Sequence, residues 1–231
     1  MNGKIPGSSR IGILTSGGDA PGMNAAVRAV YRAAHELGIE VIGIRRGFTG
    51  LIEGDFFLMD RSHVANIIHL GGTVLGTSRS EDFKTFEGRK KSAENLQNAE
   101  IDALLVIGGE GSFRGADLFN DETGIPTIGI PGSIDNDIPG TDFSIGFDTA
   151  INTALEAIDK IRDTAISHGR LFFVEVMGRS SDLIAIESGI AGGAEYLVLP
   201  GDQNAITDLC TRLTDAFHAG KRYAIVVVAE G

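Results

Sequence analysis

The stretch RIGILTSGGDAPGMN, residues Arg10–Asn24, joins a short apolar run to a glycine-rich turn and then to a helical pattern. Its residues Ile11–Leu14 predict a buried strand. Gly17 and Gly18 follow this strand, and Pro21 stands where a proline can begin a helix. Since glycines have no side chain, they let a phosphate approach the backbone at such a strand end. The stretch predicts a strand, a candidate phosphate-binding turn and a helix.

The same alternation continues along the chain and predicts the fold class. Further strands are expected at Val41–Ile44, Ala103–Ile107, Thr127–Ile130, Leu171–Val176, Tyr196–Leu199 and Tyr223–Val228. Apolar residues at helical spacing lie between them: Val27, Val30, Tyr31 and Ala34; Ile151, Ala154, Leu155 and Ile158; Ile206, Leu209, Cys210 and Leu213. The last set predicts that Cys210 is a small core residue. This alternation indicates an α/β protein, which we expect to form two Rossmann-like three-layer lobes with mostly parallel sheets.

No repeat or linker divides the sequence, so the domain boundary is inferred from the loop of residues 131–147 and the long helical pattern after it. We expect a flexible leader over residues 1–9, one lobe over residues 10–146 and a second over residues 147–231. The chain stops directly after its most apolar strand, although a strand buried in a parallel sheet is normally followed by covering elements. The second lobe is therefore expected to be incomplete at the C-terminus.

Composition and charge exclude several classes of protein. The 231 residues carry 20 basic and 31 acidic side chains, a net charge of −11, which argues against a general nucleic-acid binder. The longest apolar run, Ala224–Ala229, is far shorter than the ~20 residues of a membrane-spanning helix. Cys210 is the single cysteine, so no internal disulfide forms, and a cytoplasmic location is expected.

Two more polar loops follow predicted strands, and ligands bind at the carboxyl ends of strands in open α/β sheets. The loop Gly108–Ser112 precedes a predicted helix, whose N-terminal amides attract phosphates. The loop Pro131–Asp137 carries two carboxylates, Asp135 and Asp137, in a position suited to acid–base or metal chemistry. Each loop alone is also compatible with an ordinary turn, and no Walker A sequence is present. Their recurrence at successive strand ends favours a functional site.

Four segments resemble, in order and spacing, the signatures of the ATP-dependent 6-phosphofructokinases: Gly17–Asn24, Gly71–Arg79, Pro131–Asp137 and Met177–Arg179. The resemblance runs from about Arg10 to Glu230. It implies a two-domain α/β subunit, usually a homotetramer, that transfers the terminal phosphate of Mg-ATP to the 1-hydroxyl of fructose 6-phosphate. The lobe of residues 10–146 would then bind the nucleotide, and that of residues 147–231 the sugar phosphate.

The resemblance also implies roles for individual residues. Asp135 matches the catalytic base, Asp137 its supporting carboxylate and Ser133 the hydroxyl beside the sugar. Arg79 resembles the arginine near the transferring phosphate, and Glu110 occupies the place of the magnesium-linked acid. Nucleotide contacts are expected at Gly17, Arg45, Arg79, Ser80, Gly109, Glu110, Gly111 and Ser112. Sugar-phosphate contacts, among which Arg179 is also a catalytic candidate, are expected at Ser133, Asp135, Asp137, Arg170, Met177, Gly178, Arg179 and Glu230. A regulatory site is expected at Arg28, Arg32, Arg162, Glu195 and Lys221.

Individual residues at these positions indicate which phosphate donor is used, and they leave alternative functions open. Pyrophosphate-dependent relatives usually carry Asp where Gly111 stands and Lys where Gly132 stands, so glycine at both positions favours ATP. Glu110 replaces the usual aspartate, and a longer arm can still hold magnesium through water. Arg45 replaces an aromatic residue that stacks on adenine, which a guanidinium can also do. A pyrophosphate-dependent enzyme, another kinase of the superfamily and a noncatalytic nucleotide-binding fragment remain alternative functions.

Overall fold

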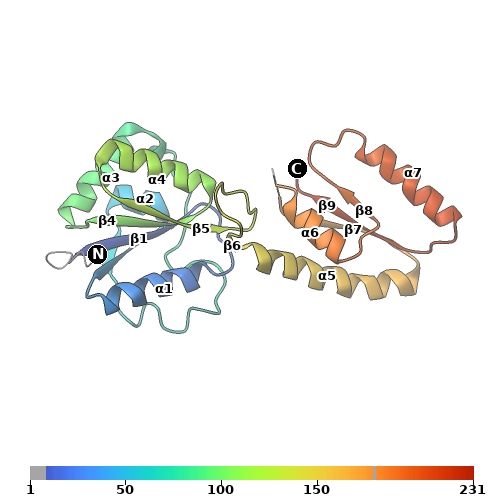
Figure 1. The fold of residues 1–231 in the computed structure, drawn as a ribbon, viewed down its shortest axis with the longest axis horizontal. Helices are drawn as coiled ribbons and strands as arrows, with labels where there is room; N and C mark the ends of the chain where they lie inside the picture. The colour runs from blue at the N-terminus through green and yellow to red at the C-terminus, as the bar shows by residue number, and fades with distance from the viewer. Residues whose placement is uncertain (1–8, 179–180) are drawn as a thin grey trace. The chain divides into compact units, whose positions relative to one another are not determined.

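A computed structural model describes residues 9–178 and 181–231. The described residues form two compact units. The first contains the chain up to Ser133 and residues 137–146, and the second contains residues 134–136 and the chain from Phe147 onward. Each unit is an α/β fold on its own sheet, coloured from blue to yellow-green and from yellow to red in Figure 1. None of the helices in the described residues is both long and apolar enough to cross a membrane.

The first unit is built on a six-stranded sheet of order β3-β2-β1-β4-β5-β6, in which only β3 is antiparallel to its neighbour. Helix α1 covers one face of this sheet, and helices α2, α3 and α4 cover the other (Figure 1). Its elements in chain order are β1 (Arg10–Ser16), α1 (Met23–Glu36), β2 (Glu40–Ile44), α2 (Gly47–Glu53), β3 (Phe56–Leu58), the 3₁₀ helix η1 (Asp82–Lys84), α3 (Phe86–Asn98), β4 (Ala103–Gly108), α4 (Glu110–Thr123), β5 (Thr127–Ser133) and β6 (Ile145–Gly146).

One hydrophobic cluster of the first unit lies between the sheet and helices α2 to α4. Alternate residues of the central strands, such as Leu14, Ile44 and Leu104, are fully buried there. They meet Leu51 and Leu96 from the helices. β1, β2 and β4 are largely buried, and their short apolar runs, like that of β5, were predicted as strands from the sequence. The prediction of a mostly parallel α/β sheet is confirmed.

Strands β3 and β6 and the burial of Ser9 are among the features of the first unit that were not predicted. Strands β3 and β6 are too short, at three and two residues, to give a periodic signal. Ser9, expected in the leader, is buried, and its carbonyl accepts a hydrogen bond from the Glu40 amide. The rest of the expected leader, residues 1–8, lies outside the described residues.

The second unit carries a three-stranded parallel sheet of order β7-β9-β8. Helices α5 and α6 pack on one face of it, where Ile158, Ile184, Ile225 and Val227 form a separate core. The elements in chain order are α5 (Phe147–His168), β7 (Leu171–Val176), α6 (Leu183–Ala191), β8 (Tyr196–Val198), α7 (Ala205–His218) and β9 (Ala224–Ala229). Both sheets are thus parallel, apart from β3.

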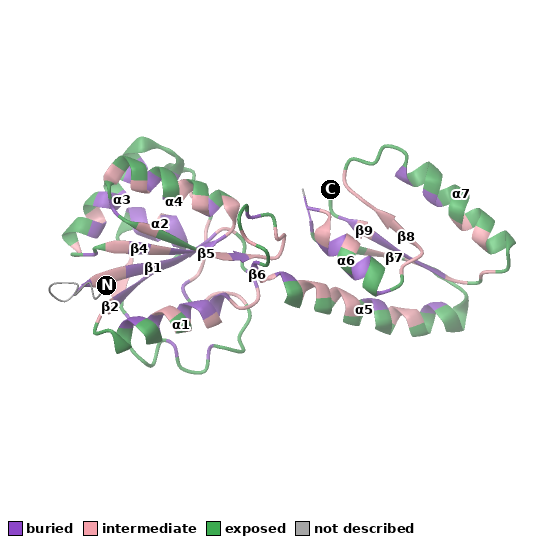
Figure 2. Cartoon of the chain, in the orientation of Figure 1, coloured by how far each residue is buried: buried purple, intermediate pink, exposed green. Residues whose placement is uncertain are grey.

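Helix α7 buries only part of the predicted stripe, and most of its surface is exposed (Figure 2). Ala205 and Leu209 are buried, whereas Ile206 is 74% exposed and Cys210 is exposed. Residues four apart share a helical face, so the buried face follows 205 and 209, one residue before 206 and 210. The prediction that Cys210 lies in the core is wrong.

Candidate functional site

The register of the first sheet brings three loops to one edge. Ser16 at the end of β1 pairs with Gly108 at the end of β4, and Gly108 pairs in turn with Pro131 on β5. The loops beginning at Gly17, Gly109 and Ser133 therefore leave neighbouring parallel strands at the same edge. This is where ligands bind in open α/β sheets.

Two of these loops are joined by a buried hydrogen bond. The Ser112 hydroxyl donates to the Ser16 hydroxyl at 2.9 Å, and the exposed fraction of Ser112 is only 7%. Gly108 lies against this pair, since a Cβ at that position would stand 2.5 Å from the Ser16 carbonyl and 2.8 Å from Ser112 Oγ. Gly17, with φ of +87°, has a backbone conformation that favours glycine. The glycines allow the two loops to approach closely.

Helix α4 begins at this edge, with Gly109 as its N-cap residue and no side chain capping it. The first amides of a helix have no partner within the helix, and they carry the positive end of its dipole. A Cβ on Gly111 would meet no atom within 4 Å, so the space beside the first turn is open. Ser133 lies 3.8 Å from the Cβ position of Gly109. The predicted residues Gly17, Gly109, Gly111, Ser112 and Ser133 therefore lie around one edge of the sheet.

Glu110 is the carboxylate in the first turn of α4, and it forms an ion pair with Arg114 one turn later. Its side chain remains 37% exposed. The described residues contain no cluster of three or more His, Cys, Asp or Glu side chains that would form a metal cage. Magnesium at phosphate sites is commonly held by one or two carboxylates, water and the substrate's own phosphates. A single exposed carboxylate beside bare helix amides fits that kind of site.

Residues 71–80, called here the strap, cross this edge of the sheet and carry Arg79 and Ser80. Asn24 on α1 is 1% exposed, and its amide donates to the carbonyls of Leu70 and Gly71 while accepting from the Val74 amide. At the other end of the strap, the Thr77 hydroxyl donates to the Gly17 carbonyl at 2.7 Å. The predicted signature at Gly71–Arg79 is thus packed against the first glycine loop.

Two further backbone contacts fix the middle of the strap. The Thr15 hydroxyl lies 2.9 Å from the Gly76 carbonyl and 2.8 Å from the Thr73 hydroxyl. The Arg46 amide donates to the Leu75 carbonyl. Sequence reasoning assigned no role to Asn24, Thr15 or Thr77. The available signal was the presence of an amide and two hydroxyls within otherwise apolar or glycine-rich motifs.

Arg79 is exposed on the strap, whereas Arg45 is held by neighbouring side chains. The Arg45 guanidinium lies 4.2 Å from the centre of the Phe57 ring and pairs with Asp55 at 3.1 Å. Arg46 pairs with Asp55 and Glu53. Hydrogen bonds from Arg46 and then Arg45 lower the pKa of Asp55 below its usual value. One face of the Arg45 guanidinium therefore rests on an aromatic ring.

The two aspartates of the third loop belong to different units. Asp137 is exposed and lies in the first unit with Ser133. Asp135 lies in the second unit, where its carbonyl accepts a hydrogen bond from the Ser181 hydroxyl at 2.7 Å. The same Ser181 packs against Gly178, where an added Cβ would stand 2.3 Å from the Ser181 carbonyl. The second unit therefore brings Asp135 and Gly178 to the same residue.

The other residues expected to bind the sugar phosphate lie at the ends of the second sheet. Met177 and Gly178 follow β7 directly. Glu230 follows β9, and its amide donates to the Val176 carbonyl. Arg170 is exposed just before β7, at the opposite end of that strand. Arg179, which was also expected to contact the sugar phosphate, lies outside the described residues.

The residues expected to form a regulatory site fall into two groups, one in each unit. Arg28 and Arg32 line a pocket of about 360 Å³ between α1 and the loop after β3, together with Arg61 and His35. In the second unit, the Lys221 ammonium pairs with Glu195 at 2.7 Å, and Arg162 donates to the Gly192 carbonyl. The Arg61 and His35 side chains were not predicted, because they lie in no motif.

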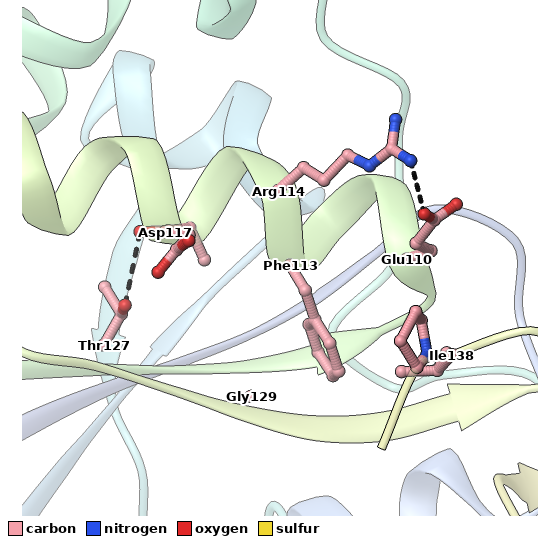
Figure 3. Close-up of a pocket in the computed structure, with 9 residues that line it drawn as sticks. Glu110, Phe113, Arg114, Asp117, Thr127, Gly129 and Ile138 are labelled. Atoms are coloured by element: carbon pink, nitrogen blue, oxygen red, sulfur yellow. Dashed lines mark hydrogen bonds and ion pairs between the residues drawn. The ribbon is translucent and has the colours of Figure 1, made fainter. Parts of the chain in front are cut away.

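A larger groove of about 480 Å³ runs along α4 and β5 of the first unit (Figure 3). The Glu110–Arg114 ion pair stands at one end of it, and Thr127 at the other. The Phe113 ring covers Gly129, whose Cβ position is 2.8 Å from the ring. This groove lies between helix and strand, and the glycine loops of β1 and the strap do not line it.

Comparison with known proteins confirms the resemblance. The family model described as "Phosphofructokinase" matches residues 10–231. An ATP-dependent 6-phosphofructokinase of Halothermothrix orenii is 55% identical over 96% of the chain and 67% of that protein. ATP-dependent 6-phosphofructokinase 1 of Thermus thermophilus is 57% identical over 96% of the chain and 69% of that protein. The chain therefore spans about two thirds of the length of these curated relatives.

Solved structures agree with this assignment. A Pichia pastoris phosphofructokinase in the T-state superposes with a TM-score of 0.88 at 38% identity, over 96% of the chain and 28% of that protein. A pyrophosphate-dependent phosphofructokinase of Marinobacter aquaeolei shares the fold, with a TM-score of 0.79 at 24% identity. Together with the strand-end loops of both sheets, these matches show that the chain belongs to the phosphofructokinase family.

Proposed function

We propose that this chain carries the nucleotide-binding and sugar-phosphate-binding parts of an ATP-dependent 6-phosphofructokinase. In the proposed reaction, the 1-hydroxyl of fructose 6-phosphate attacks the terminal phosphate of ATP, giving fructose 1,6-bisphosphate and ADP. The observation that carries the proposal is the 55–57% identity, over 96% of the chain, with proteins named for that activity. The open space beside Gly111 supports it, because an aspartate there would crowd the inner phosphates of ATP.

In this proposal the first unit binds the nucleotide. The Gly17 loop and the first amides of α4 hold the phosphates, and Ser80 and Arg45 contact the rest of the nucleotide. Magnesium would be held by water and the Glu110 carboxylate, and it would offset the negative charge of the ATP phosphates. Arg79 adds positive charge next to the transferring group, a contribution that can reach ~10³–10⁵ in rate.

The acceptor, fructose 6-phosphate, is bound mainly by residues of the second unit in this proposal. Asp135 takes the proton of the attacking hydroxyl. Asp137 and Ser133, which belong to the first unit, act as its supporting carboxylate and as the hydroxyl beside the sugar. An ordinary aspartate is sufficient, because phosphoryl transfer through a loose transition state needs mainly alignment and charge compensation. Met177, Gly178, Arg179 and Glu230 hold the sugar phosphate in this scheme. Arg170 reaches the sugar phosphate bound by a neighbouring copy of the chain, so the proposal includes a homotetramer, whose effector site is formed by Arg28, Arg32, Arg162, Glu195 and Lys221.

A donor assay on the purified chain tests the proposal. The chain is incubated with magnesium and fructose 6-phosphate, with either ATP or pyrophosphate as donor, and bisphosphate formation is followed. Nucleotide binding is measured in parallel by calorimetry. Turnover with ATP is the expected result. Higher turnover with pyrophosphate contradicts the donor assignment, and ATP binding without turnover shows that this chain is a noncatalytic nucleotide-binding part.

The Asp135→Ser variant tests the proposed base. A positioned general base contributes ~10²–10⁴ in rate, so we expect kcat to fall by a factor in that range. The apparent affinity for ATP should change less than about twofold, because the nucleotide loops lie in the first unit. Thr85→Ser is the control substitution. It keeps the hydroxyl at the N-cap of α3, in the first unit, and should leave kcat unchanged. A variant that turns over at the wild-type rate removes Asp135 from the mechanism.

A further inference from the structure

We propose that Thr77 is a positioning residue for the phosphate-binding turn at Gly17 and Gly18. The inference rests on the proposed function, since it assumes that this turn holds a phosphate of ATP. Thr77 lies on the strap, 60 residues along the chain from Gly17, and its hydroxyl donates to the Gly17 carbonyl at 2.7 Å. The side chain itself is not proposed to touch the nucleotide.

The geometry of a trans peptide connects this hydrogen bond to ligand binding. The carbonyl of one residue and the amide N–H of the next point in opposite directions across a planar peptide, and the described chain contains no cis peptide. When Thr77 holds the Gly17 carbonyl, the Gly18 N–H is turned away from the strap. Gly18 is exposed, and a Cβ there would meet no atom within 4 Å, so its amide is accessible to a ligand.

A glycine turn needs such a contact because its backbone is otherwise free to rotate. Gly17 has φ of +87° and is followed by a second glycine, so side-chain sterics do not select one peptide orientation. An unfixed turn loses conformational entropy when it orders around a ligand, which weakens binding. A single hydrogen bond to the Gly17 carbonyl removes part of that loss before the nucleotide arrives.

Thr77 can act this way only if the strap is itself held in place, and two side chains outside the strap, Asn24 and Thr15, anchor it. Buried Asn24 makes three hydrogen bonds across residues 70–74. The Thr15 hydroxyl donates its single proton to the carbonyl of Gly76, the residue directly before Thr77. The Thr73 hydroxyl must therefore donate to Thr15, and it accepts from the Leu75 amide at 3.3 Å. These contacts hold the strap on the N-terminal side of Thr77, up to its neighbour Gly76.

The test compares Thr77→Val, which removes the hydroxyl and keeps the shape, with Thr77→Ser, which keeps the hydroxyl. Thr127→Val is the matched control, because Thr127 also donates its hydroxyl to a backbone carbonyl, that of Ala116, at the beginning of β5. Dissociation constants for ATP are measured by calorimetry on the 231-residue chain. The Gly18 amide is followed by ¹⁵N NMR during the same titrations, and thermal midpoints are recorded for every variant.

One net hydrogen bond corresponds to a change of roughly two- to tenfold in a dissociation constant, so we expect Thr77→Val to weaken ATP binding by about fivefold. Thr77→Ser and Thr127→Val should stay within twofold of the wild type. The shift of the Gly18 amide on ATP addition should be reduced in Thr77→Val alone.

Unchanged affinity in Thr77→Val, or equal loss in Thr77→Ser or Thr127→Val, overturns the positioning role while leaving the proposed function intact. A wild-type chain that binds no ATP overturns both.

Discussion

At the scale of single residues, Gly108 fixes the distance between the two glycine loops. Its Cβ position is 2.5 Å from the Ser16 carbonyl and 2.8 Å from the Ser112 hydroxyl. We expect Gly108→Ala to lower the free energy of unfolding by about 1–3 kcal/mol, because the backbone must move to accept the methyl group. The affinity for ATP should fall more than about tenfold, because the hydrogen bond between the Ser16 and Ser112 hydroxyls is broken. The free energy of unfolding is measured by urea unfolding monitored by circular dichroism. The affinity for ATP is measured by calorimetry.

Gly111→Ala is the matched control for that experiment. Its added methyl meets no atom within 4 Å, so the free energy of unfolding should stay within about 0.5 kcal/mol of the wild type. ATP binding should nevertheless weaken, because the methyl enters the space beside the first turn of α4. Equal destabilisation by the two substitutions contradicts the close packing assigned to Gly108.

Cys210 gives a second test at the residue scale. The helical pattern predicted a core residue, whereas the thiol lies on the exposed side of α7. We expect the native chain to react with a thiol reagent at nearly the rate of the urea-unfolded chain. Cys210→Ser should change the free energy of unfolding by less than about 0.5 kcal/mol. A thiol that reacts only after unfolding contradicts the position of the buried stripe at Ala205 and Leu209.

At the scale of elements, one buried ion pair joins α3, α4 and η1. Arg89 on α3, 6% exposed at its side chain, binds both carboxylate oxygens of Glu122 on α4 at 2.6 and 2.7 Å. It also donates to the Phe83 and Lys84 carbonyls of η1. Glu122→Ala leaves this guanidinium without its counter-charge and should cost about 3 kcal/mol of stability. The exposed pair of Glu156 and Lys160 on α5 is the control, worth less than about 0.5 kcal/mol.

The same pair predicts a pH dependence. The hydrogen bond from Arg89 lowers the pKa of Glu122 below its usual 4.5. The unfolded chain therefore takes up this proton at a higher pH than the folded chain does. The stabilisation is fully present above pH 4.5 and is lost as pH falls from there through the folded pKa. Glu122→Gln should flatten this part of the stability curve, and an unchanged slope between wild type and variant contradicts the assignment.

The individual elements also show which parts of the fold could be predicted from the sequence. Strands β1, β2, β4, β5, β7, β8 and β9 were predicted because each is a short run rich in apolar and β-branched residues. β3 and β6 were not, since two or three residues carry no period. The strand-end glycines could be located because they follow apolar runs directly, and at Gly17 and Gly108 the backbone favours or requires glycine. The hydrogen bonds of Asn24, Thr15 and Thr77 could not be predicted, because a polar side chain gives no indication of which distant carbonyl it will bind.

At the scale of the whole molecule, each unit has its own core and its own group of candidate ligand contacts. A ligand that binds one unit should slow amide hydrogen exchange mainly there, because local openings follow separately packed cores. We expect a nonhydrolysable ATP analogue to slow exchange in residues 15–18 and 109–113. Fructose 6-phosphate alone should slow exchange next to Met177 and Glu230. Exchange measured by mass spectrometry resolves these peptides.

Gly108→Ala separates the two responses. It disturbs only the junction of Ser16 and Ser112 in the first unit, so it should abolish the protection by the ATP analogue while preserving that by the sugar phosphate. Strand β9, Ala224–Ala229, is mostly buried and provides an internal reference for the stability of the second unit. Protection by the ATP analogue that appears first in β7 and β9 contradicts a nucleotide site built from the loops of the first sheet.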